Sequence, residues 1–395
     1  SEQLNALVHI CSVLSNYLES KENFATESVY DTIEYLAPDL EYTIQSCSWK
    51  QQRINCSKFI SPILTSKGLC FTFNALSSHE IYNKEMAPGI IKHTNNHGNM
   101  SFWNLENGYN EEFIGNEYPM RVSHFGHESG LELTLSTRTS DRNPKCHSHS
   151  KGFQIFLTTP GDSLYNIIPF QIQPLADTLY AIEPRLSYSP KKLSKYQSKQ
   201  RQCFFDSERL LRFFKSYTKA NCLHECVANF TMRECGCVPF SMPRDKSTRI
   251  CGASKINCYE KAVKKFRKNY GEQYHCNCLE ACIDNSRVIR SSVCTFPGFH
   301  ASRTRLAIFF EDEYIQTKTA VETYTMGDFL SICGGLLGLF LGVSALSVIE
   351  LIYYVTLRLF WTIRYSRYEN TDTPSEQTSH DGQTDKNKGK REVYH

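Results

Sequence analysis

The chain has 395 residues, 41% hydrophobic and 22% charged, a length and composition that fit two or three domains with ordinary buried cores. Its net charge of +3 excludes the strongly basic surface that is typical of nucleic-acid-binding proteins. HExxH, Walker-loop, nucleophile-elbow and GxGxxG patterns are missing from the sequence, so we expect a protein that is not an enzyme and has no cofactor or resident metal.

The 17 cysteines are many for this length, and all except Cys11 and Cys333 lie between residues 47 and 294. Such a density is typical of chains that fold in an oxidising compartment, where cysteines pair as disulfides. N-glycosylation sequons at Asn55, Asn99 and Asn229 lie in the same region. We therefore expect this region to be extracellular.

Residues 1–45 are predicted to be helical. Apolar residues recur at three- and four-residue spacing over Leu4–Leu18, which indicates one amphipathic helix. A second helix is expected over Thr26–Leu36, and Pro38 would end it.

Residues 46–130 change from strand to loop character. Cys47 and Cys56 are close enough in sequence to close a short loop, and Phe71–Asn74 has the composition of a strand. Residues 77–130 have no sustained period, and we expect long loops with solvated histidines. Metal binding and proton sensing are the alternatives for those histidines, because imidazole ligates metals and titrates near neutral pH. The histidines are His79, His93, His97, His124 and His127.

Residues 131–190 alternate between apolar and polar, which predicts strands. Leu131, Leu133 and Leu135 would share one face of a strand, and further strands are expected over Gly152–Leu157 and Leu179–Tyr188. Between them, Cys146-His-Ser-His149 has the form of half a zinc site, with no second half nearby.

Eleven cysteines lie between residues 203 and 294. Cys222 and Cys226 are one turn apart on a predicted helix. We expect the cysteines of Cys276–Cys282 to lie opposite them on a second helix. A charged helix is predicted between them over Glu260–Tyr270. We expect a ladder of disulfides that joins helices. Zinc is the alternative, although it favours Cys-x-x-Cys pairs in closed sets of four.

A strand is predicted over Leu306–Phe310, within residues 300–325, which lead into the apolar run 329–357. A spanning helix needs roughly 20 apolar residues, and this run exceeds that length. Gly334, Gly338 and Gly342 recur every fourth residue, the pattern that lets transmembrane helices approach closely.

Two further features distinguish this run from a plain anchor. Gly342-Val343-Ser344 places a helix-weakening glycine beside a hydroxyl at mid-membrane, where irregular backbone is tolerated only next to protein or a water-filled cavity. Glu350 is a charge at membrane depth, which is costly unless it faces a pore or a partner. We therefore expect a span that faces a pore or a partner, and not a plain anchor.

Positive residues beyond the run predict its orientation. Arg358, Arg364 and Arg367 flank the span, and positive flanks stay in the cytoplasm. Residues 1–325 would then be outside the cell, and the polar residues 366–395 would form a disordered cytoplasmic tail. The chain begins with Ser1 and shows no signal peptide, so we expect a removed signal or a preceding transmembrane helix.

Three separated motifs resemble the degenerin/epithelial sodium channel superfamily, and most closely the pickpocket-type channels of insects. The first is Gly334–Glu350, which is similar to the second transmembrane helix with its Gly-x-Ser filter. The second is the cysteine signature at Tyr217–Cys226 and Cys235–Pro243. The third is Gly68–Asn74, which resembles a passage between finger and palm.

The resemblance implies an α+β membrane protein with a disulfide-rich extracellular domain, in which a β-rich palm carries a helical thumb and finger, and a C-terminal transmembrane pore helix. The implied divisions are finger with part of palm and knuckle at 1–130, palm strands at 131–202, disulfide-laddered thumb at 203–294, palm return strand and linker at 295–326, pore helix at 327–364 and disordered cytoplasmic tail at 365–395. By the family pattern the chain is N-terminally truncated and begins inside the finger.

The function implied is that of a subunit of a trimeric, ligand- or stimulus-gated, amiloride-sensitive channel that conducts Na⁺ across the plasma membrane. Its partners would be identical or related subunits, the bilayer and an extracellular stimulus or ligand. Two alternatives stay open: an accessory, non-conducting channel subunit, and a single-pass receptor with a disulfide-rich ectodomain. A receptor would explain the cysteines and the single span, but not the glycine pattern or Glu350.

The resemblance also implies roles for individual residues. Gly342, Val343 and Ser344 would form the selectivity filter, Glu350 a ring of carboxylates below it, and Ser331 the gating position at the outer mouth, while Gly334 and Gly338 would serve helix packing. The disulfides implied are Cys47–Cys56, Cys203–Cys282, Cys222–Cys278, Cys226–Cys276, Cys235–Cys258 and Cys237–Cys251. Cys70 would lack its usual partner, which lies upstream in the family, and no pairing is implied for Cys11, Cys146 and Cys294.

Overall fold

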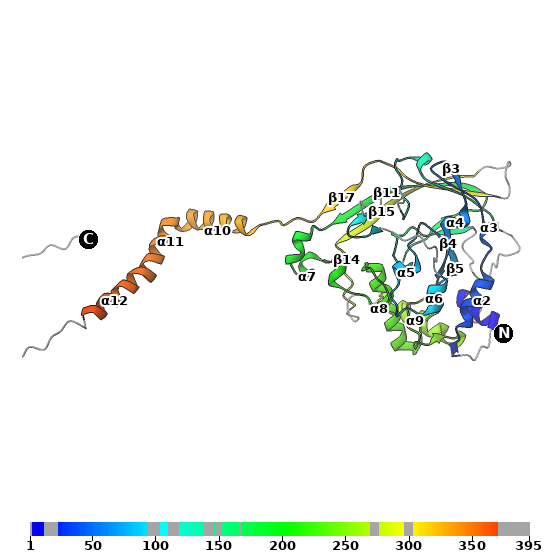
Figure 1. The fold of residues 1–395 in the computed structure, drawn as a ribbon, viewed down its shortest axis with the longest axis horizontal. Coiled ribbons are helices and arrows are strands. Elements are labelled where there is room, and N and C mark those ends of the chain that lie inside the picture. The colour runs from blue at the N-terminus through cyan, green and yellow to red at the C-terminus, as the bar shows by residue number, and fades with distance from the viewer. Residues whose placement is uncertain are drawn as a thin grey trace, which may run out of the picture. The chain divides into compact units, whose positions relative to one another are not determined.

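The computed structural model describes residues 2–11, 23–93, 103–109, 118–137, 146, 152–165, 167–268, 276–295 and 303–369. The chain divides into two units, Ser1–Val321 and Glu322–His395, which we describe separately. The larger unit mixes helices and strands and is rich in disulfides, as the sequence predicts, and the smaller unit is helical (Figure 1).

The α-helices of the larger unit range from one turn to four. They are α1 (Glu2–Ile10), α2 (Ser28–Leu36), α3 (Leu40–Thr43), α4 (Cys56–Phe59), α5 (Ser78–Ile81), α6 (Pro88–Lys92), α7 (Ser198–Arg201), α8 (Lys219–Cys235) and α9 (Ile256–Lys268). Short 3₁₀ turns lie at His127–Ser129, Lys191–Lys195, Asp206–Glu208 and Ala253–Lys255.

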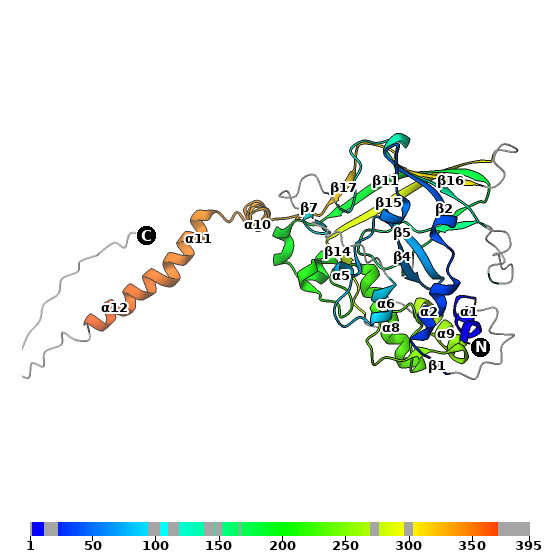
Figure 2. The ribbon, with the colours of Figure 1, turned by 45° about the vertical axis from the view of Figure 1, so that its right-hand side comes forward.

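A seven-stranded sheet forms the frame of this unit (Figure 2). Its strands are, in order across the sheet, β15 (Ile283–Thr295), β11 (Ala176–Tyr188), β16 (Thr304–Phe310), β8 (Leu131–Leu135), β2 (Ile44–Trp49) and β3 (Gln52–Ile54), with β17 (Gln316–Thr319) also paired to β11. The long strand β11 runs antiparallel to β15 but parallel to β16 and β17. The predicted strands over Leu131–Leu135 and Leu306–Phe310 are therefore neighbours, with Leu133 opposite Leu306.

Two-stranded pairings surround this sheet. They are β4 (Ile60–Thr65) with β5 (Gly68–Phe73), β9 (Phe153–Ile155) with β10 (Phe170–Ile172), β12 (Cys203–Phe204) with β14 (Glu280–Ala281), β1 (Phe24–Ala25) with β13 (Ile250–Cys251), and β6 (Trp103–Asn104) with β7 (Gly108–Tyr109). One hydrophobic core lies between the sheet and the hairpins β4–β5 and β9–β10, around Ile60, Ile172 and Leu306. A cavity of about 1230 Å³ also lies between them, so these layers are not in contact over their whole length.

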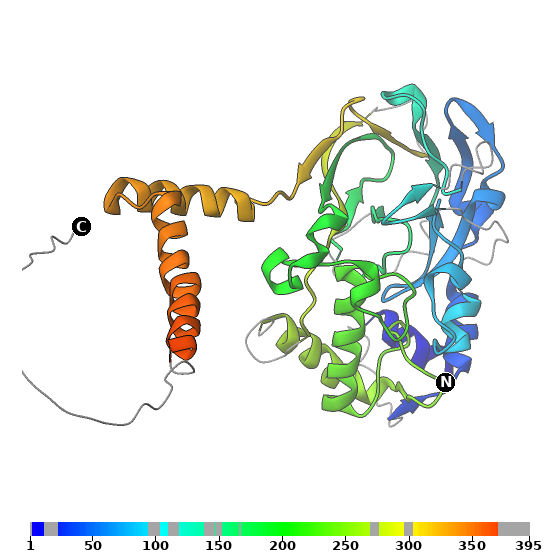
Figure 3. The ribbon, with the colours of Figure 1, turned by 60° about the vertical axis from the view of Figure 1, so that its left-hand side comes forward.

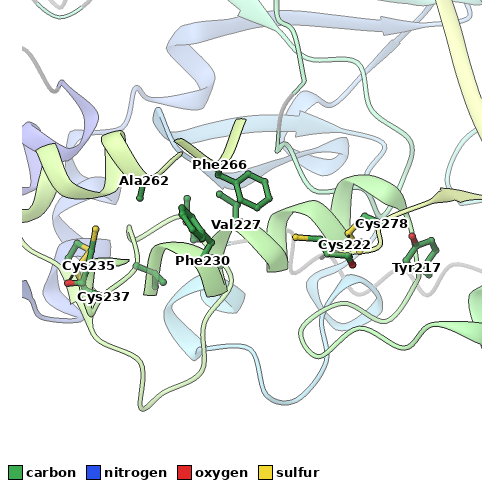
Figure 4. Close-up of a cluster of buried hydrophobic side chains, with 14 of the residues drawn as sticks. Tyr217, Cys222, Val227, Phe230, Cys235, Cys237, Ala262, Phe266 and Cys278 are labelled. Atoms are coloured by element: carbon green, nitrogen blue, oxygen red, sulfur yellow. Dashed lines mark hydrogen bonds between the residues drawn. A yellow bond between two sulfur atoms is a disulfide. The ribbon is translucent and has the colours of Figure 1, made fainter. Parts of the chain in front are cut away.

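The helices α8 and α9 pack on each other around a second core. Phe230 of α8 and Phe266 of α9 are buried with ring centroids 5.7 Å apart, and Val227 and Ala262 lie beside them (Figure 4). Local signals set the ends of α8. The Thr218 hydroxyl accepts a hydrogen bond from Asn221 N at 3.1 Å, and Gly236 ends the helix in the left-handed region with φ of 72°.

Seven disulfides join described cysteines of the larger unit. Six are the pairs that the resemblance implies, and the seventh joins Cys11 to Cys146, for which no pairing was implied. Cys70 and Cys333 have no disulfide partner among the described residues. Because Cys146 is paired with Cys11, its sulfur is not available as a zinc ligand in Cys146-His-Ser-His149.

The predicted second helix at Cys276–Cys282 is wrong. This segment contains no helix: Asn277 has a left-handed backbone with φ of 46°, and the segment contributes only β14. Cys222 pairs with Cys278 and Cys226 with Cys276, so a four-residue step on α8 matches a two-residue step on this segment.

The remaining predicted helices and loops agree with the structure in part. The predicted helix over Thr26–Leu36 is confirmed in α2, and the one over Glu260–Tyr270 is confirmed in α9 as far as Lys268, beyond which the next residues lie outside the described part of the chain. The predicted helix over Leu4–Leu18 is described only to Ile10, and the part from residue 12 lies outside the described residues. The predicted loops at 77–130 contain the short helices α5 and α6, which the absence of a sustained period did not reveal.

Candidate functional site

The apolar run of the smaller unit forms separate helices. α10 (Met326–Leu341) is followed by three residues, then α11 (Ala345–Ile352), a π-helical turn at Tyr353–Arg358 and α12 (Leu359–Glu369). The stretch Ala345–Arg367 is long and apolar enough to cross a bilayer, and α10 is a shorter apolar helix. The helix predicted over 327–364 is therefore interrupted, and the chain changes direction between α10 and α11 (Figure 3).

Glycine makes the break possible. Gly342 has φ of 64° and ψ of 18°, in the left-handed region, where a side chain costs about 1–2 kcal/mol. Its N–H donates to Gly338 O at 3.1 Å, and Val343 N donates to Leu337 O at 3.3 Å. This closure is typical of a helix C-terminus. Gly338 lies directly under it, because a Cβ there would be 3.6 Å from Val343 O.

Ser344 begins the next helix. Its backbone is extended, with φ of −104° and ψ of 165°, and its Oγ accepts a hydrogen bond from Ser347 N at 3.3 Å. Ser344 O then accepts from Val348 N at 3.2 Å, which starts the α11 hydrogen bonds. Ser344 is therefore the N-cap of α11.

The break changes what the backbone offers. Between the closure at Gly342 and the start of α11 at Ser344, the i to i−4 pattern of hydrogen bonds stops. In a bilayer such backbone must face protein or a water-filled cavity. Carbonyl and hydroxyl oxygens are the kinds of group that replace water around an ion in selectivity filters in general.

The other predicted residues lie at definite positions along these helices. Ser331, Gly334 and Gly338 are spaced three and four residues apart in α10, so they share one face. Glu350 lies in α11, six residues beyond Ser344, or about 9 Å along a helix axis. A capping box between Thr325 and Asp328 begins α10.

The larger unit contains the glycosylation candidates. Asn55 and Asn229 are exposed, as a glycan requires, and Asn99 lies outside the described residues. Asn55 also caps α4, since its Oδ1 accepts from Ser57 N at 3.1 Å.

The histidines of residues 77–130 are not all solvated. His79, His124 and His127 are exposed as expected, and His97 lies outside the described residues. His93 contradicts the expectation, because its side chain is only 4% exposed and lies against the ring of Tyr30. The reason is that α6, which the sequence did not reveal, packs on α2.

Two histidines with buried ring nitrogens were missed by the sequence reasoning. His224 of α8 stacks on Tyr165, with ring centroids 5.2 Å apart, and burial lowers its pKa to about 3. His9 of α1 stacks on Tyr259, and burial lowers its pKa to about 4. Both are therefore neutral at physiological pH.

Comparison with known proteins adds the family. The family described as "Amiloride-sensitive sodium channel" matches residues 3–354, which include both the five disulfides between residues 203 and 282 and the helix break. The chain belongs to this family. The resemblance predicted from the three motifs is thereby confirmed.

Similar proteins include Pickpocket protein 28 and Pickpocket protein 11 of Drosophila melanogaster and Acid-sensing ion channel 4-B of Danio rerio. The first is 27% identical over 359 residues, covering 84% of this chain and 59% of the relative. The second is 24% identical, covering 85% and 58%, and the third is 23% identical, covering 85% and 55%. The chain thus spans a little more than half the length of these family members. The third relative and the matching family are named as channels and not as enzymes, which agrees with the expected class.

Proposed function

We propose that this chain is a subunit of a trimeric, stimulus-gated, amiloride-sensitive sodium channel of the plasma membrane, with its larger unit outside the cell and its C-terminus in the cytoplasm. The observation that carries the proposal is the helix break at Gly342–Ser344, within a match to the amiloride-sensitive sodium channel family. A further relative, 25% identical over 185 residues, is named "Epithelial sodium channel subunit gamma" of Xenopus laevis, and its name supports assembly with other subunits.

Selectivity would arise at the break. Three copies around an axis would bring together the carbonyls of Gly342 and Val343 and the hydroxyl of Ser344, which replace part of the hydration shell of Na⁺. Glu350 would form a carboxylate ring about 9 Å further along and favour cations over anions. No resident cofactor is needed, because the permeant ion is the only species that the chain would handle there.

Gating would connect the two units through the chain that leads from β16 and β17 into α10. The five disulfides between residues 203 and 282, which we call the cysteine ladder, stiffen the region of α8 and α9. A stiff region passes on a displacement that a flexible one would absorb. Gly334 and Gly338 would let α10 pack closely on its copies, and Ser331 would occupy the outer mouth on the same face.

The filter assignment is tested by patch-clamp recording from cells that express the longest natural form of the chain. We expect Ser344→Ala to lower the Na⁺/K⁺ permeability ratio, because one oxygen per subunit leaves the filter. The matched control is Leu346→Ile, an apolar exchange two residues away, which should leave the ratio unchanged.

The recordings also separate the alternatives. Sodium current with a permeability ratio that Ser344→Ala and Gly342→Ala leave unaltered would contradict the filter assignment. Current that appears only with a second, related subunit would favour the accessory role. Surface protein without current in any combination of subunits would favour the receptor role.

A further inference from the structure

The helix α2 presents two carboxylates on one face. Asp31 and Glu34 are three residues apart, so their side chains lie one turn apart on the same side of the helix. The opposite side of α2 is buried through Val29, Tyr30 and Ile33. The carboxylates face the solvent, with 69% and 54% of their side chains exposed.

The helix α6 lies beside α2 (Figures 1 and 2). His93 directly follows α6, and its ring stacks on Tyr30 with centroids 6.0 Å apart. Gly89 makes this approach possible, because a Cβ there would be 2.5 Å from the ring of Tyr30. The backbone of α6 is therefore held tightly against α2, and His93 is held with it.

The imidazole is aimed at the carboxylates. His93 Nδ1 is 3.6 Å from Glu34 Oε2, just beyond hydrogen-bond distance, although the side chain is only 4% exposed. Its Nε2 is buried without a hydrogen-bond partner among the described residues. One ligand atom each from Asp31, Glu34 and His93 lies within 4.8 Å of the others. Burial lowers the pKa of His93, although Glu34 opposes the shift, and a neutral imidazole is the form that binds metals.

We propose that Asp31, Glu34 and His93 form a binding site for a divalent transition-metal ion of the Zn²⁺ class. One imidazole nitrogen and two carboxylate oxygens are donors that Zn²⁺ accepts, with water as the fourth ligand. Ligand atoms at about 2 Å from a tetrahedral ion lie roughly 3.3 Å apart, so the exposed carboxylates close by about 1 Å around the buried imidazole. The bound ion joins α2 to α6.

The structure also contains a competitor for the ion. Lys92 Nζ lies 3.2 Å from Asp31 Oδ1, and 65% of its side chain is exposed. The lysine adds positive charge beside the site, so the ion must displace it from Asp31. Exposed ion pairs are weak, so the ion can displace Lys92 at little cost in binding free energy. The competition gives the site a signature that an adventitious metal contact on another histidine lacks.

The site is tested with the full, untagged chain in detergent, stripped with EDTA and titrated with Zn²⁺ in a calorimeter and with Co²⁺ by absorption. We expect one tight site, and visible absorption bands for Co²⁺ bound with low coordination number. Glu34→Gln and His93→Gln should each weaken binding by at least about tenfold. Lys92→Gln should strengthen it by about two- to fivefold, because the competing cation is removed.

The matched controls are His79→Gln, an exposed histidine outside the cluster, which should leave the affinity unchanged, and the melting temperature of each variant without metal. Glu34 is exposed, so Glu34→Gln folds even where His93→Gln does not, and the test does not depend on one variant. Zn²⁺ should raise the melting temperature of the wild type but not of Glu34→Gln. Unchanged affinity in Glu34→Gln, or no gain in Lys92→Gln, would overturn the site. Neither result depends on current, so the channel assignment stands or falls separately.

Discussion

α8 and α10 have nearly equal lengths, 17 and 16 residues, but different sources of order. α8 is joined to other segments by disulfides at Cys222, Cys226 and Cys235, and it buries a row of side chains against α9. α10 has no disulfide and no buried side chain within the described part of the chain.

The difference indicates where each helix takes its stability. The chain itself specifies α8, through covalent bonds and a core that closes within one unit. Local signals alone specify α10 and α11, namely the capping box at Thr325, the left-handed Gly342 and the cap at Ser344. In the proposed channel, the remaining stability of α10 and α11 would come from lipid and from other subunits. Substitutions in the first region should therefore change the stability of one chain, and those in the second should change assembly and conduction.

The largest expected effect comes from removing two rungs of the cysteine ladder together. Replacing Cys222, Cys226, Cys276 and Cys278 by alanine should lower the free energy of unfolding of the larger unit by about 4 kcal/mol or more, because loops of about 50 residues are no longer closed. Either rung alone should cost less than half of this, since the other rung, one helical turn away, still holds the same segments together. Urea unfolding in detergent, followed by tryptophan fluorescence in a Trp361→Phe background, measures the larger unit.

The matched control is Cys333→Ala in α10, which breaks no disulfide and should leave that unfolding curve unchanged. If removing one disulfide lowered the free energy of unfolding as much as removing both, neighbouring disulfides would not substitute for each other in holding α8 to the segment Cys276–Cys278, and this interpretation would be contradicted.

A pair of glycines gives the next largest effect. Gly152 has φ of 104°, and a Cβ there would be 2.1 Å from Ile172 O, whereas a Cβ at Gly342 would meet nothing within 4 Å. Gly152→Ala should lower the free energy of unfolding of the larger unit by about 3 kcal/mol, because it adds backbone strain and overpacking together. Gly342→Ala should leave the stability of the larger unit unchanged and act on the permeability ratio. A large loss of stability in Gly342→Ala by the same fluorescence assay would contradict the separation of the two regions.

Much of the larger unit could be predicted because its signals are local. The helix of Cys222 and Cys226, the strand at Leu131–Leu135 and the end of α2 before Pro38 follow from spacing and from breakers. The pairing of Cys11 with Cys146 could not be predicted, because 135 residues separate them and spacing carries no signal over that distance.

The helix break could be predicted because its signals are local. The glycine and hydroxyl of Gly342-Val343-Ser344 predicted a weak point, since left-handed backbone and capping are properties of single residues. The cluster of Asp31, Glu34 and His93 was not predicted. Its two carboxylates are three residues apart in a helix that the sequence predicts. The imidazole belongs to His93, which follows the short helix α6, and a helix of five residues shows no hydrophobic period in the sequence.

The smallest of the three effects is a response to acid, and it should also separate the two regions. His224 is neutral and packed between the rings of Tyr165 and Phe214, with its pKa lowered to about 3, whereas the unfolded chain binds a proton near the ordinary value of about 6.5. Between these values the unfolded state holds more protons. The stability of the larger unit should therefore be complete above about pH 6.5 and fall by up to about 1.4 kcal/mol per pH unit below it.

His224→Phe tests this, because phenylalanine keeps the stacked ring but cannot be protonated. The slope of unfolding free energy against pH, averaged between 6.5 and 5, should decrease by about 1.1 kcal/mol per unit relative to the wild type. Glu225 titrates in the opposite sense, since burial raises its carboxyl pKa, and it is retained in both proteins, so its contribution cancels. α10, α11 and α12 contain no histidine, and acid should leave them unchanged over this range. An unaltered slope in His224→Phe would mean that this imidazole is protonated without unfolding, and that the packing around α8 opens more easily than its disulfides suggest.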